Sequence, residues 1–246
     1  MDHDAVAAGE IDRAARDLVG LGSCVYRGWM IPPNRYHELD EALANAGTHL
    51  RTSPTGYEHA HRLPHWYASV ERWTPASAWT TSPSLDEFDE LLAGFGSGPA
   101  VIRDYSKSEK HYWDEAMFIP DVTDRGRARQ VAERLAELRG DFFDTGFVIR
   151  QFERFQPAEW RSWWVDGECR MISAHPDSPD ISPPPDLDLA ALAPDIATLE
   201  LTFASVDVTR SKDDDSLRII EVGDGQVSDR PSTTDPTTFL AAILGG

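Results

Sequence analysis

The chain has 246 residues, a hydrophobic fraction of 41% and a formal net charge of −19 at pH 7. This composition is typical of a folded globular protein with one or two domains and a sizeable core. The negative charge argues against bulk binding to nucleic acid or to an anionic membrane surface, because both are polyanions.

Two cysteines, Cys24 and Cys169, are too few for a disulfide framework, which predicts reduced thiols and a cytoplasmic protein. The first residues lack the basic region and apolar core of a signal peptide. No run of about 18 apolar residues occurs, so we expect no transmembrane helix.

The first half of the chain predicts helices with short strands between them. Asn34 is the expected N-cap of one helix and Gly47 its terminator, while Ser84 and Glu87 form a capping box. Glycines at 94, 96 and 98, followed by Pro99, mark a linker. The expected elements are a helix at 10–20, a strand at 23–26, a helix at 34–46, a strand at 48–51, irregular or short helical structure at 54–73 and a helix at 84–95.

After the linker, strands outnumber helices. Asp166-Gly167 between apolar runs is a strong two-residue hairpin signal, and Pro194 is expected to break a helix. The expected elements are a strand at 100–103, a helix at 125–139, a strand at 147–155, a hairpin at 159–173, a loop at 175–187, a helix at 187–197, strands at 199–208 and 217–222, and a helix at 236–244. This order favours antiparallel strand pairs in an α+β fold.

Two of the three lysines, Lys107 and Lys110, follow the apolar run that ends at Ile102, and Arg103 lies between. A lysine ammonium is a compact charge on a flexible stem, which suits it to a phosphate. The three cations therefore predict a local anion site on an acidic protein. A solvated loop that carries two lysines by chance is the alternative.

Three acidic residues lie at the ends of the last two strands. Asp207 and Glu221 each end a strand, and Asp224 follows in the turn Gly223-Asp-Gly225. Antiparallel pairing can bring these carboxylates to one edge, where they and phosphate oxygens would give the octahedral oxygen ligation that Mg²⁺ needs. A polar hairpin end with a glycine-rich turn is the alternative.

Two arginines lie within aromatic strands, Arg150 in 147–155 and Arg161 in 159–165. An arginine in such a strand is costly to bury without an anion. It can hold an anionic ligand, reach solvent, or pair with Glu153 or Glu159, and the sequence leaves all three open.

Other common site motifs are weak or missing. His59, His61 and His65 have spacing that could bind a transition metal, but no carboxylate or cysteine set completes it, so loop structure near an aromatic patch is favoured. The sequence has no Walker-type phosphate loop, no Gly-x-Gly-x-x-Gly turn and no nucleophile elbow. A nucleotide would therefore be held by side chains and strand edges.

Taken together, these segments resemble the ATP-grasp superfamily, and in detail its compact R-two-K clade of bacterial and phage proteins. The resemblance runs from about residue 22 to residue 232. The motifs that carry it are Tyr26-Arg-Gly-Trp29, the lysine segment 101–113, Phe147-Val-Ile-Arg-Gln-Phe-Glu153, Arg161-Ser-Trp-Trp-Val-Asp-Gly167 and Ile219-Ile-Glu-Val-Gly-Asp-Gly-Gln226.

The resemblance implies an ATP-grasp fold, in which two α+β subdomains hold ATP between antiparallel sheets after a small N-terminal α/β domain. We expect the N-terminal domain over 1–97 and the ATP-grasp domain over 98–246. Within the latter, the first subdomain would cover 98–150 and the second 151–246.

Site roles are implied residue by residue. Arg103, Lys107 and Lys110 would contact the phosphates of ATP. The strand that holds Gln151, Phe152 and Glu153 would form the adenine hinge, with Glu153 as a ribose or adenine contact.

Arg150 and Arg161 would stabilise phosphoryl or acyl-phosphate oxygens, which makes them, with Lys107 and Lys110, the expected catalytic set. Asp207 and Glu221 would hold Mg²⁺, and Arg27 would belong to the acceptor side. The superfamily commonly carries Glu-x-Asn at the metal strand, whereas here Glu221 and Val222 are followed by Gly223. Either Asp224 or a water would then complete the metal ligands.

The activity implied is that of an ATP-dependent carboxylate–amine ligase of the peptide-bond-forming type, acting through an acyl phosphate on small-molecule or peptide substrates. Two other functions stay open. One is a non-catalytic binding protein, such as an immunity or adaptor protein, whose acidic surface would suit a partner with a basic surface. The other is a phosphotransferase.

Overall fold

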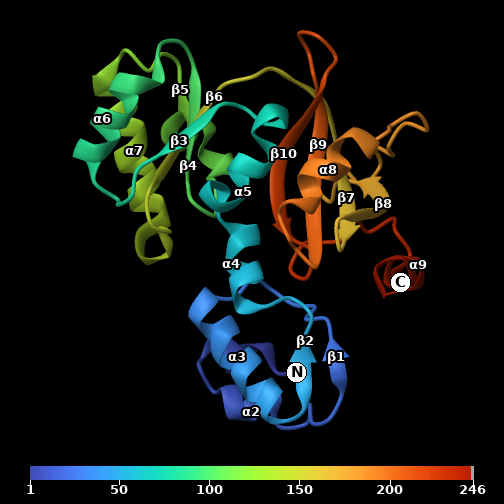
Figure 1. Cartoon of the computed structure of the whole chain (residues 1–246). Helices are drawn as coiled ribbons and strands as arrows, with labels where there is room; N and C mark the ends of the chain where they lie inside the picture. The colour runs from blue at the N-terminus through green and yellow to red at the C-terminus, as the bar shows by residue number, and fades with distance from the viewer. Residues whose placement is uncertain (245–246) are drawn as a thin grey trace. The chain divides into compact units, whose positions relative to one another are not determined.

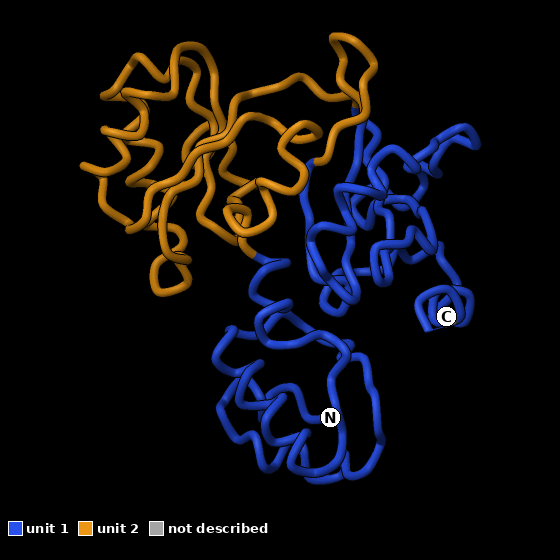
Figure 2. Tube along the Cα trace, viewed as in Figure 1, with its two compact units in different colours: residues 1–61, 157–209, 220–246 blue, residues 62–156, 210–219 orange. Residues whose placement is uncertain are grey.

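The computed structural model describes residues 1–244 and divides the chain into two compact units (Figures 1 and 2). Unit 1 comprises residues 1–61, residues 157–209 and the C-terminal segment from residue 220; unit 2 comprises residues 62–156 and 210–219. None of the helices within residues 1–244 is both long and apolar enough to cross a membrane.

The N-terminal part of unit 1 is a small helical layer with two strands. β1 and β2 pair in parallel, because α3 runs between them as a crossover. Tyr36, Leu39 and Leu43 of α3 are buried, as their helical spacing predicts. The elements are α1 His3–Ala7, α2 Ile11–Ala15, β1 Gly22–Cys24, α3 Pro33–Asn45, β2 Thr48–Leu50 and α4 Pro54–His61.

Two details of this part differ from the sequence prediction. The helix expected at 10–20 ends at Ala15. Asn34 is not an N-cap, because α3 already begins at Pro33, whose fixed φ suits the first helical position. Gly47 ends the helix as predicted, with φ +76°, a conformation that glycine adopts at little cost.

A four-stranded sheet with the order β10-β9-β7-β8 carries the rest of unit 1. Asp166 and Gly167 form the predicted turn between β7 and β8, and both have positive φ, as a tight hairpin turn requires. Pro194 is the second residue of α8 and lies in its first turn instead of breaking a helix. The elements are β7 Phe155–Val165, β8 Glu168–Ala174, η5 Ala190–Leu192, α8 Ala193–Ala197, β9 Phe203–Ser211, β10 Leu217–Asp224 and α9 Pro236–Leu244.

Unit 2 is built on an antiparallel sheet with the order β3-β6-β4-β5. Buried residues of α6 and α7 form one core with Ala100 and Ile102 of β4 and with Phe147 and Ile149 of β6, so both helices pack on the same face of the sheet. The elements are α5 Leu63–Val70, η1 Glu71–Trp73, β3 Ser77–Trp79, α6 Leu85–Phe95, β4 Ala100–Asp104, η2 Lys110–Tyr112, η3 Trp113–Met117, β5 Phe118–Ile119, α7 Arg125–Arg139, η4 Gly140–Phe142 and β6 Phe147–Gln151.

The two units do not follow the boundary that we expected at residue 97. β3 precedes the linker in sequence but hydrogen-bonds to β6, which places residues 77–79 in the sheet of unit 2. The strand expected at 147–155 is divided between β6 and the start of β7. α7 has the predicted bounds, and the Ser84 side chain caps α6 by accepting from the Glu87 amide.

Candidate functional site

Arg161 of β7 and Asp207 of β9 form a largely buried ion pair in unit 1. The Arg161 Nε and Nη2 atoms donate to the two Asp207 carboxylate oxygens at 2.7 Å each, and the side chains are 12% and 5% exposed. This two-pronged geometry is the strongest that an arginine and a carboxylate can make. The sequence left open whether Arg161 holds an anionic ligand, reaches solvent or pairs with a glutamate. In the structure it pairs with Asp207, the carboxylate that was predicted to bind Mg²⁺.

Glu159 and His175 complete a group that we call the unit 1 cluster, defined as Glu159, Arg161, His175 and Asp207. His175 Nε2 lies 3.5 Å from Asp207 Oδ2 and 3.6 Å from Glu159 Oε1. Ligand atoms of Glu159, His175 and Asp207 all lie within 4.8 Å of one another. Sequence reasoning did not single out His175, which follows the last residue of β8.

Each charged group of the cluster shifts the pKa values of its neighbours. Burial disfavours ionised Asp207, but the hydrogen bonds from Arg161 and His175 outweigh burial and lower the pKa of its carboxyl. Burial also opposes the charged form of Arg161, yet Asp207, with further attraction from Glu221, raises its pKa. Burial also opposes the charged form of His175, but the hydrogen bond and the negative charge of Asp207 outweigh burial and raise the pKa of His175. Asp207 therefore stays ionised at neutral pH.

The donor set of the cluster fits a divalent cation. Ionised Asp207 offers two oxygens, Glu159 offers a third carboxylate oxygen within reach, and Glu221 of β10 adds negative charge near Arg161. Hard cations such as Mg²⁺ select oxygen ligands of this kind. Within residues 1–244, the group of side chains close enough together to hold a metal ion is Glu159, His175 and Asp207. The three histidines with metal-like spacing in the sequence, His59, His61 and His65, do not form such a group.

Asp224 does not join the cluster. It is fully buried, and its two carboxylate oxygens accept from the backbone and side-chain amides of Gln226 at 3.1 and 3.0 Å. Gln226 also bonds to the Tyr36 hydroxyl and the Tyr26 amide. Burial raises the pKa of Asp224 to about 7, against the Gln226 hydrogen bonds and the attraction of Arg27, which lower it.

Hydroxyl groups fill the space beside Gly223, where the expected asparagine is missing. A Cβ atom on Gly223 would lie 3.0 Å from Ser205 Oγ and 3.3 Å from Ser228 Oγ, and these hydroxyls are 2.6 Å apart. A Cβ atom at residue 223 would therefore require these hydroxyls to move by a few tenths of an ångström.

Arg27 binds the turn that follows β10. Its guanidinium donates to the carbonyl oxygens of Gly225, Gln226 and Ser228 and lies over the Phe239 ring. Arg27 therefore stabilises the backbone conformation of this turn through three hydrogen bonds.

The predicted cations of unit 2 lie on a segment that we call the lysine turn, residues 103–110. Arg103 is buried, and its guanidinium donates to the carbonyl oxygens of Asp104 and Ser106. Buried Asp104 accepts from the Ser106 and Lys107 amides at 2.9 and 2.6 Å, and from Arg139 Nε at 2.7 Å. Hydrogen bonds from the buried side chains of Arg103 and Asp104 thus hold the backbone of the turn in place.

Lys107 and Lys110 are exposed on this turn, with Lys110 at the start of η2. The Arg103 side chain instead donates to backbone carbonyl oxygens of the turn. The structure therefore brings the three predicted cations into one segment, with two on the surface and one buried.

The remaining predicted residues lie along and after β6. Arg150 Nη2 donates to the Thr74 hydroxyl at 2.7 Å. Gln151 is exposed, and Phe152 packs edge-on against Phe118 with ring centres 5.2 Å apart. Both oxygens of Glu153 accept from Arg218, at 2.6 and 2.8 Å.

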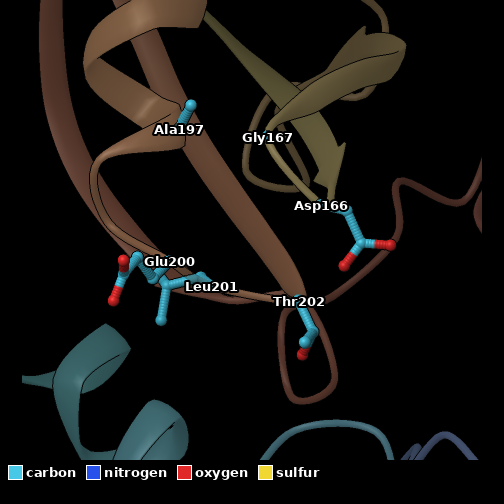
Figure 3. A pocket seen from close by; sticks show the side chains of 6 residues that line it. All are labelled: Asp166, Gly167, Ala197, Glu200, Leu201 and Thr202. Atoms are coloured by element: carbon cyan, nitrogen blue, oxygen red, sulfur yellow. The ribbon is translucent and has the colours of Figure 1, made fainter.

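Unit 1 also has an open pocket of about 190 Å³ at the β7–β8 turn, shown in Figure 3. Its lining includes two acidic side chains, Asp166 and Glu200, whose carboxylates lie on opposite sides in this view. Asp166 already pairs with Arg51 at 3.2 Å. No residue of the unit 1 cluster lines this pocket.

Comparison with solved structures identifies the fold. The crystal structure of D-cycloserine synthetase DcsG matches with a TM-score of 0.58 and 16% identity, over 96% of this chain and 92% of that one. A RimK domain ATP-grasp protein from Sphaerobacter thermophilus DSM 20745 matches with a TM-score of 0.56 and 16% identity, over 85% and 74%. The ADP complex of purK, N5-carboxyaminoimidazole ribonucleotide synthetase, matches with a TM-score of 0.59 and 12% identity, over 94% and 59%.

A family model for the ATP-grasp domain of the R-two-K clade, family 3, matches residues 92–243, more than half of the chain. No curated protein that was compared matches the sequence. The predicted α+β ATP-grasp fold is confirmed. The chain belongs to the R-two-K clade of ATP-grasp domain proteins.

Proposed function

We propose that the chain is an ATP-dependent carboxylate–amine ligase that acts through an acyl phosphate. Membership of the ATP-grasp family supports use of ATP, and two of the structural relatives are named as synthetases. The observation that carries the proposal for this chain is the unit 1 cluster, where a largely buried arginine and a buried, ionised aspartate are held on neighbouring strands.

In this proposal the unit 1 cluster holds the metal and the reacting oxygens. Asp207 and Glu221, with Glu159 in reach of Asp207, would bind Mg²⁺, which when bound neutralises charge on phosphate oxygens. Arg161 is held against Asp207, so its positive charge lies beside the proposed metal ligand and would stabilise charge that develops on the transferred group.

Unit 2 would supply the nucleotide contacts. Lys107 and Lys110 would bind the phosphates, and their exposure suits a side chain that follows a moving phosphoryl group. The edge of β6 at Gln151 and Phe152 would form the adenine hinge. Because Glu153 pairs with Arg218 through both oxygens, it is a weaker candidate for the ribose contact than the sequence suggested.

The reaction balances in two steps. A substrate carboxylate oxygen attacks the γ-phosphorus of ATP, the bond to the bridging oxygen breaks, and ADP leaves with an acyl phosphate formed. An amine then attacks the acyl carbon, phosphate leaves, and the amine proton passes to solvent. The charge is spread over phosphoryl oxygens in the first step, so catalysis depends on positioning and electrostatics.

The first test is a thermal-shift titration with ATP, ADP and Mg²⁺. A ligand that binds only the native state raises the unfolding midpoint, so we expect a shift with nucleotide that increases with Mg²⁺. No shift and no nucleotide binding by calorimetry would contradict the proposal.

The second test separates the ligase from the other functions. For a ligase, release of ADP and phosphate depends on both a carboxylate and an amine, and hydroxylamine traps the acyl phosphate as a hydroxamate. ATP binding without turnover over a broad panel of acceptors would favour a non-catalytic binding protein. A phosphorylated product that resists hydroxylamine would favour a phosphotransferase.

A further inference from the structure

Most of the lysine turn has no regular secondary structure. β4 ends at Asp104 and η2 begins at Lys110, so residues 105–109 lie outside the helices and strands. The backbone of such a segment depends on side chains for its hydrogen bonds. Lys107 and Lys110 are therefore positioned only as well as the side chains that support the turn hold it.

Arg139, the last residue of α7, supports the lysine turn at two places. Its Nε atom donates to Asp104 Oδ2 at 2.7 Å, and its Nη1 atom donates to Glu109 Oε1 at 3.3 Å. The other oxygen of Asp104 accepts from the Lys107 amide at 2.6 Å, and Glu109 directly precedes Lys110. One guanidinium thus joins a carboxylate that binds the backbone of the first lysine to a carboxylate beside the second.

These contacts are largely shielded from solvent. The side chains of Arg139, Asp104 and Glu109 are 16%, 0% and 20% exposed. Burial opposes the charge of Arg139, but the hydrogen bonds and negative charges of the two carboxylates outweigh burial and raise its pKa. Arg139 Nη2 also donates to the Phe142 carbonyl oxygen at 3.0 Å. Each guanidinium nitrogen therefore donates to a protein group, which favours a supporting role over direct contact with a ligand.

We propose that Arg139 is a positioning residue, which clamps the lysine turn through Asp104 and Glu109 and so holds Lys107 and Lys110 where they bind the phosphates of ATP. The inference rests on the proposed function, because that function assigns the phosphates to these lysines. The clamp itself is a property of unit 2 and can be tested without nucleotide.

The first measurement uses the scarcity of lysine. A lysine-specific endoprotease can cut this chain only after Lys107, Lys110 and Lys212, and all three are exposed. Cleavage follows the population of locally opened protein when opening and closing are faster than cleavage. Gln at residue 139 places an amide near the position of Nε, so it keeps a donor for Asp104 but does not reach Glu109.

We expect Arg139→Gln to be cut about 10-fold faster than the wild type in the lysine turn, the typical effect of losing a hydrogen bond between charged groups. Cleavage after Lys212 should not change, because this lysine lies between β9 and β10.

The second measurement compares the binding of ATP and of adenosine, which has no phosphates, by calorimetry. Arg139→Gln should lower ATP affinity by about 10-fold and leave adenosine affinity unchanged, whereas general destabilisation would lower both. In a protein that already carries Lys107→Ala, Arg139→Gln should lower ATP affinity by a smaller factor, because Arg139 acts through the lysines.

The control is Arg129→Gln, because Arg129 lies on the same helix but pairs with Asp86 and Asp89 of α6. It should match the wild type in both measurements. Arg139→Met, which has no donor for Asp104, should have a larger effect than Arg139→Gln. Circular dichroism melting shows which variants fold, and Arg139→Gln keeps the comparison valid if Arg139→Met does not.

Two outcomes overturn the inference alone. One is unchanged cleavage after Lys107 and Lys110 in Arg139→Gln and in every other Arg139 variant that folds. The other is unchanged ATP affinity in folded Arg139→Gln, while the wild type binds ATP and Lys107→Ala binds it more weakly. A wild type that does not bind ATP, or a Lys107→Ala variant that binds it equally well, would overturn the phosphate contacts of the proposed function and the positioning role with them.

Discussion

The charged segments of the two units solve different physical problems. In the unit 1 cluster, ionised Asp207 is buried, Arg161 is largely buried, and each is oriented by the other. In the lysine turn of unit 2, the buried members Arg103 and Asp104 fix the backbone, while Lys107 and Lys110 are exposed. The first arrangement suits a fixed metal and transition-state charge, and the second suits a phosphate that moves.

A similar contrast exists inside unit 1. Asp207 and Asp224 are both buried, but only Asp207 faces an arginine that bonds to both of its oxygens. The pKa of Asp207 is lowered for this reason, whereas burial raises the pKa of Asp224 to about 7. A buried carboxylate therefore stays ionised only where a partner such as Arg161 supplies the opposite charge, and this difference supports the metal-binding role that we propose for Asp207.

The largest expected effect comes from breaking the buried pair. Asp207→Asn leaves the Arg161 charge buried without its counter-charge, which typically costs about 3–5 kcal/mol of unfolding free energy. Urea unfolding measures this loss. The control is the double variant Arg161→Met with Asp207→Met, which we expect to be more stable than the single variant, because it buries no unpaired charge. A stable Asp207→Asn would contradict the tight pairing.

The second prediction concerns pH and Asp224. The folded-state pKa is about 7 and the unfolded value 3.8, so the folded state binds the extra proton between these values. The stability that this proton contributes is present below about pH 4 and is lost as pH rises toward 7, by at most about 4 kcal/mol.

The difference in unfolding free energy between the wild type and Asp224→Asn, measured from pH 4 to pH 8, isolates this group. We expect the variant to lose less stability as pH rises. The charged and titratable groups that face Asp224 are Arg27, Tyr26, Tyr36 and Tyr57. Equal pH profiles in both proteins would mean that Asp224 is ionised when buried.

The third prediction tests the lysine turn. Lys107→Ala should lower turnover by about a hundredfold, the typical effect of losing one contact to a charged transition state. The unfolding midpoint should not change, because the side chain is exposed. Lys212→Ala, the change at the third lysine of the chain, should affect neither activity nor stability. Equal activity of the Lys107 variant would remove it from the site.

The smallest expected effect is at Glu153. Glu153→Gln weakens the pair with Arg218, whose side chain is 16% exposed, and should cost about 1 kcal/mol of stability. ATP affinity, measured by calorimetry, should change little, because the structure uses both Glu153 oxygens for Arg218. A hundredfold loss of ATP affinity would instead support the nucleotide contact implied by the sequence.

Local signals in the sequence determined much of the fold. The N-cap at Ser84, the terminator Gly47 and the Asp166-Gly167 turn all act through a few neighbouring residues, and each lies where it was predicted. The second half of the expected capping box is absent, because the Glu87 carboxylate accepts from Thr81 and Ser82 and not from the Ser84 amide. The bounds of α7 follow from an apolar stripe at helical spacing and a terminal glycine. Family motifs, read from the same segments, predicted the ATP-grasp fold that the family match confirms.

Tertiary structure decided which residues of the β7–β8 hairpin lie on the same face of the sheet. The β-bulge at Trp163 and Trp164 shifts the β7–β8 register by one residue, so that Arg161 pairs with Ser173 instead of Ile172. Since alternate residues face opposite sides of a strand, this single shift puts His175 on the face of Arg161 and not on the other.

The same reason explains the partners of the charged residues. The sequence by itself determined that Arg161, Asp207 and the two lysines would be concentrated in strands and one turn. Only long-range pairing could decide that Arg161 meets Asp207 from another hairpin, and that Asp224 turns to Gln226. Contacts across 46 residues depend on register and burial, which no local pattern encodes.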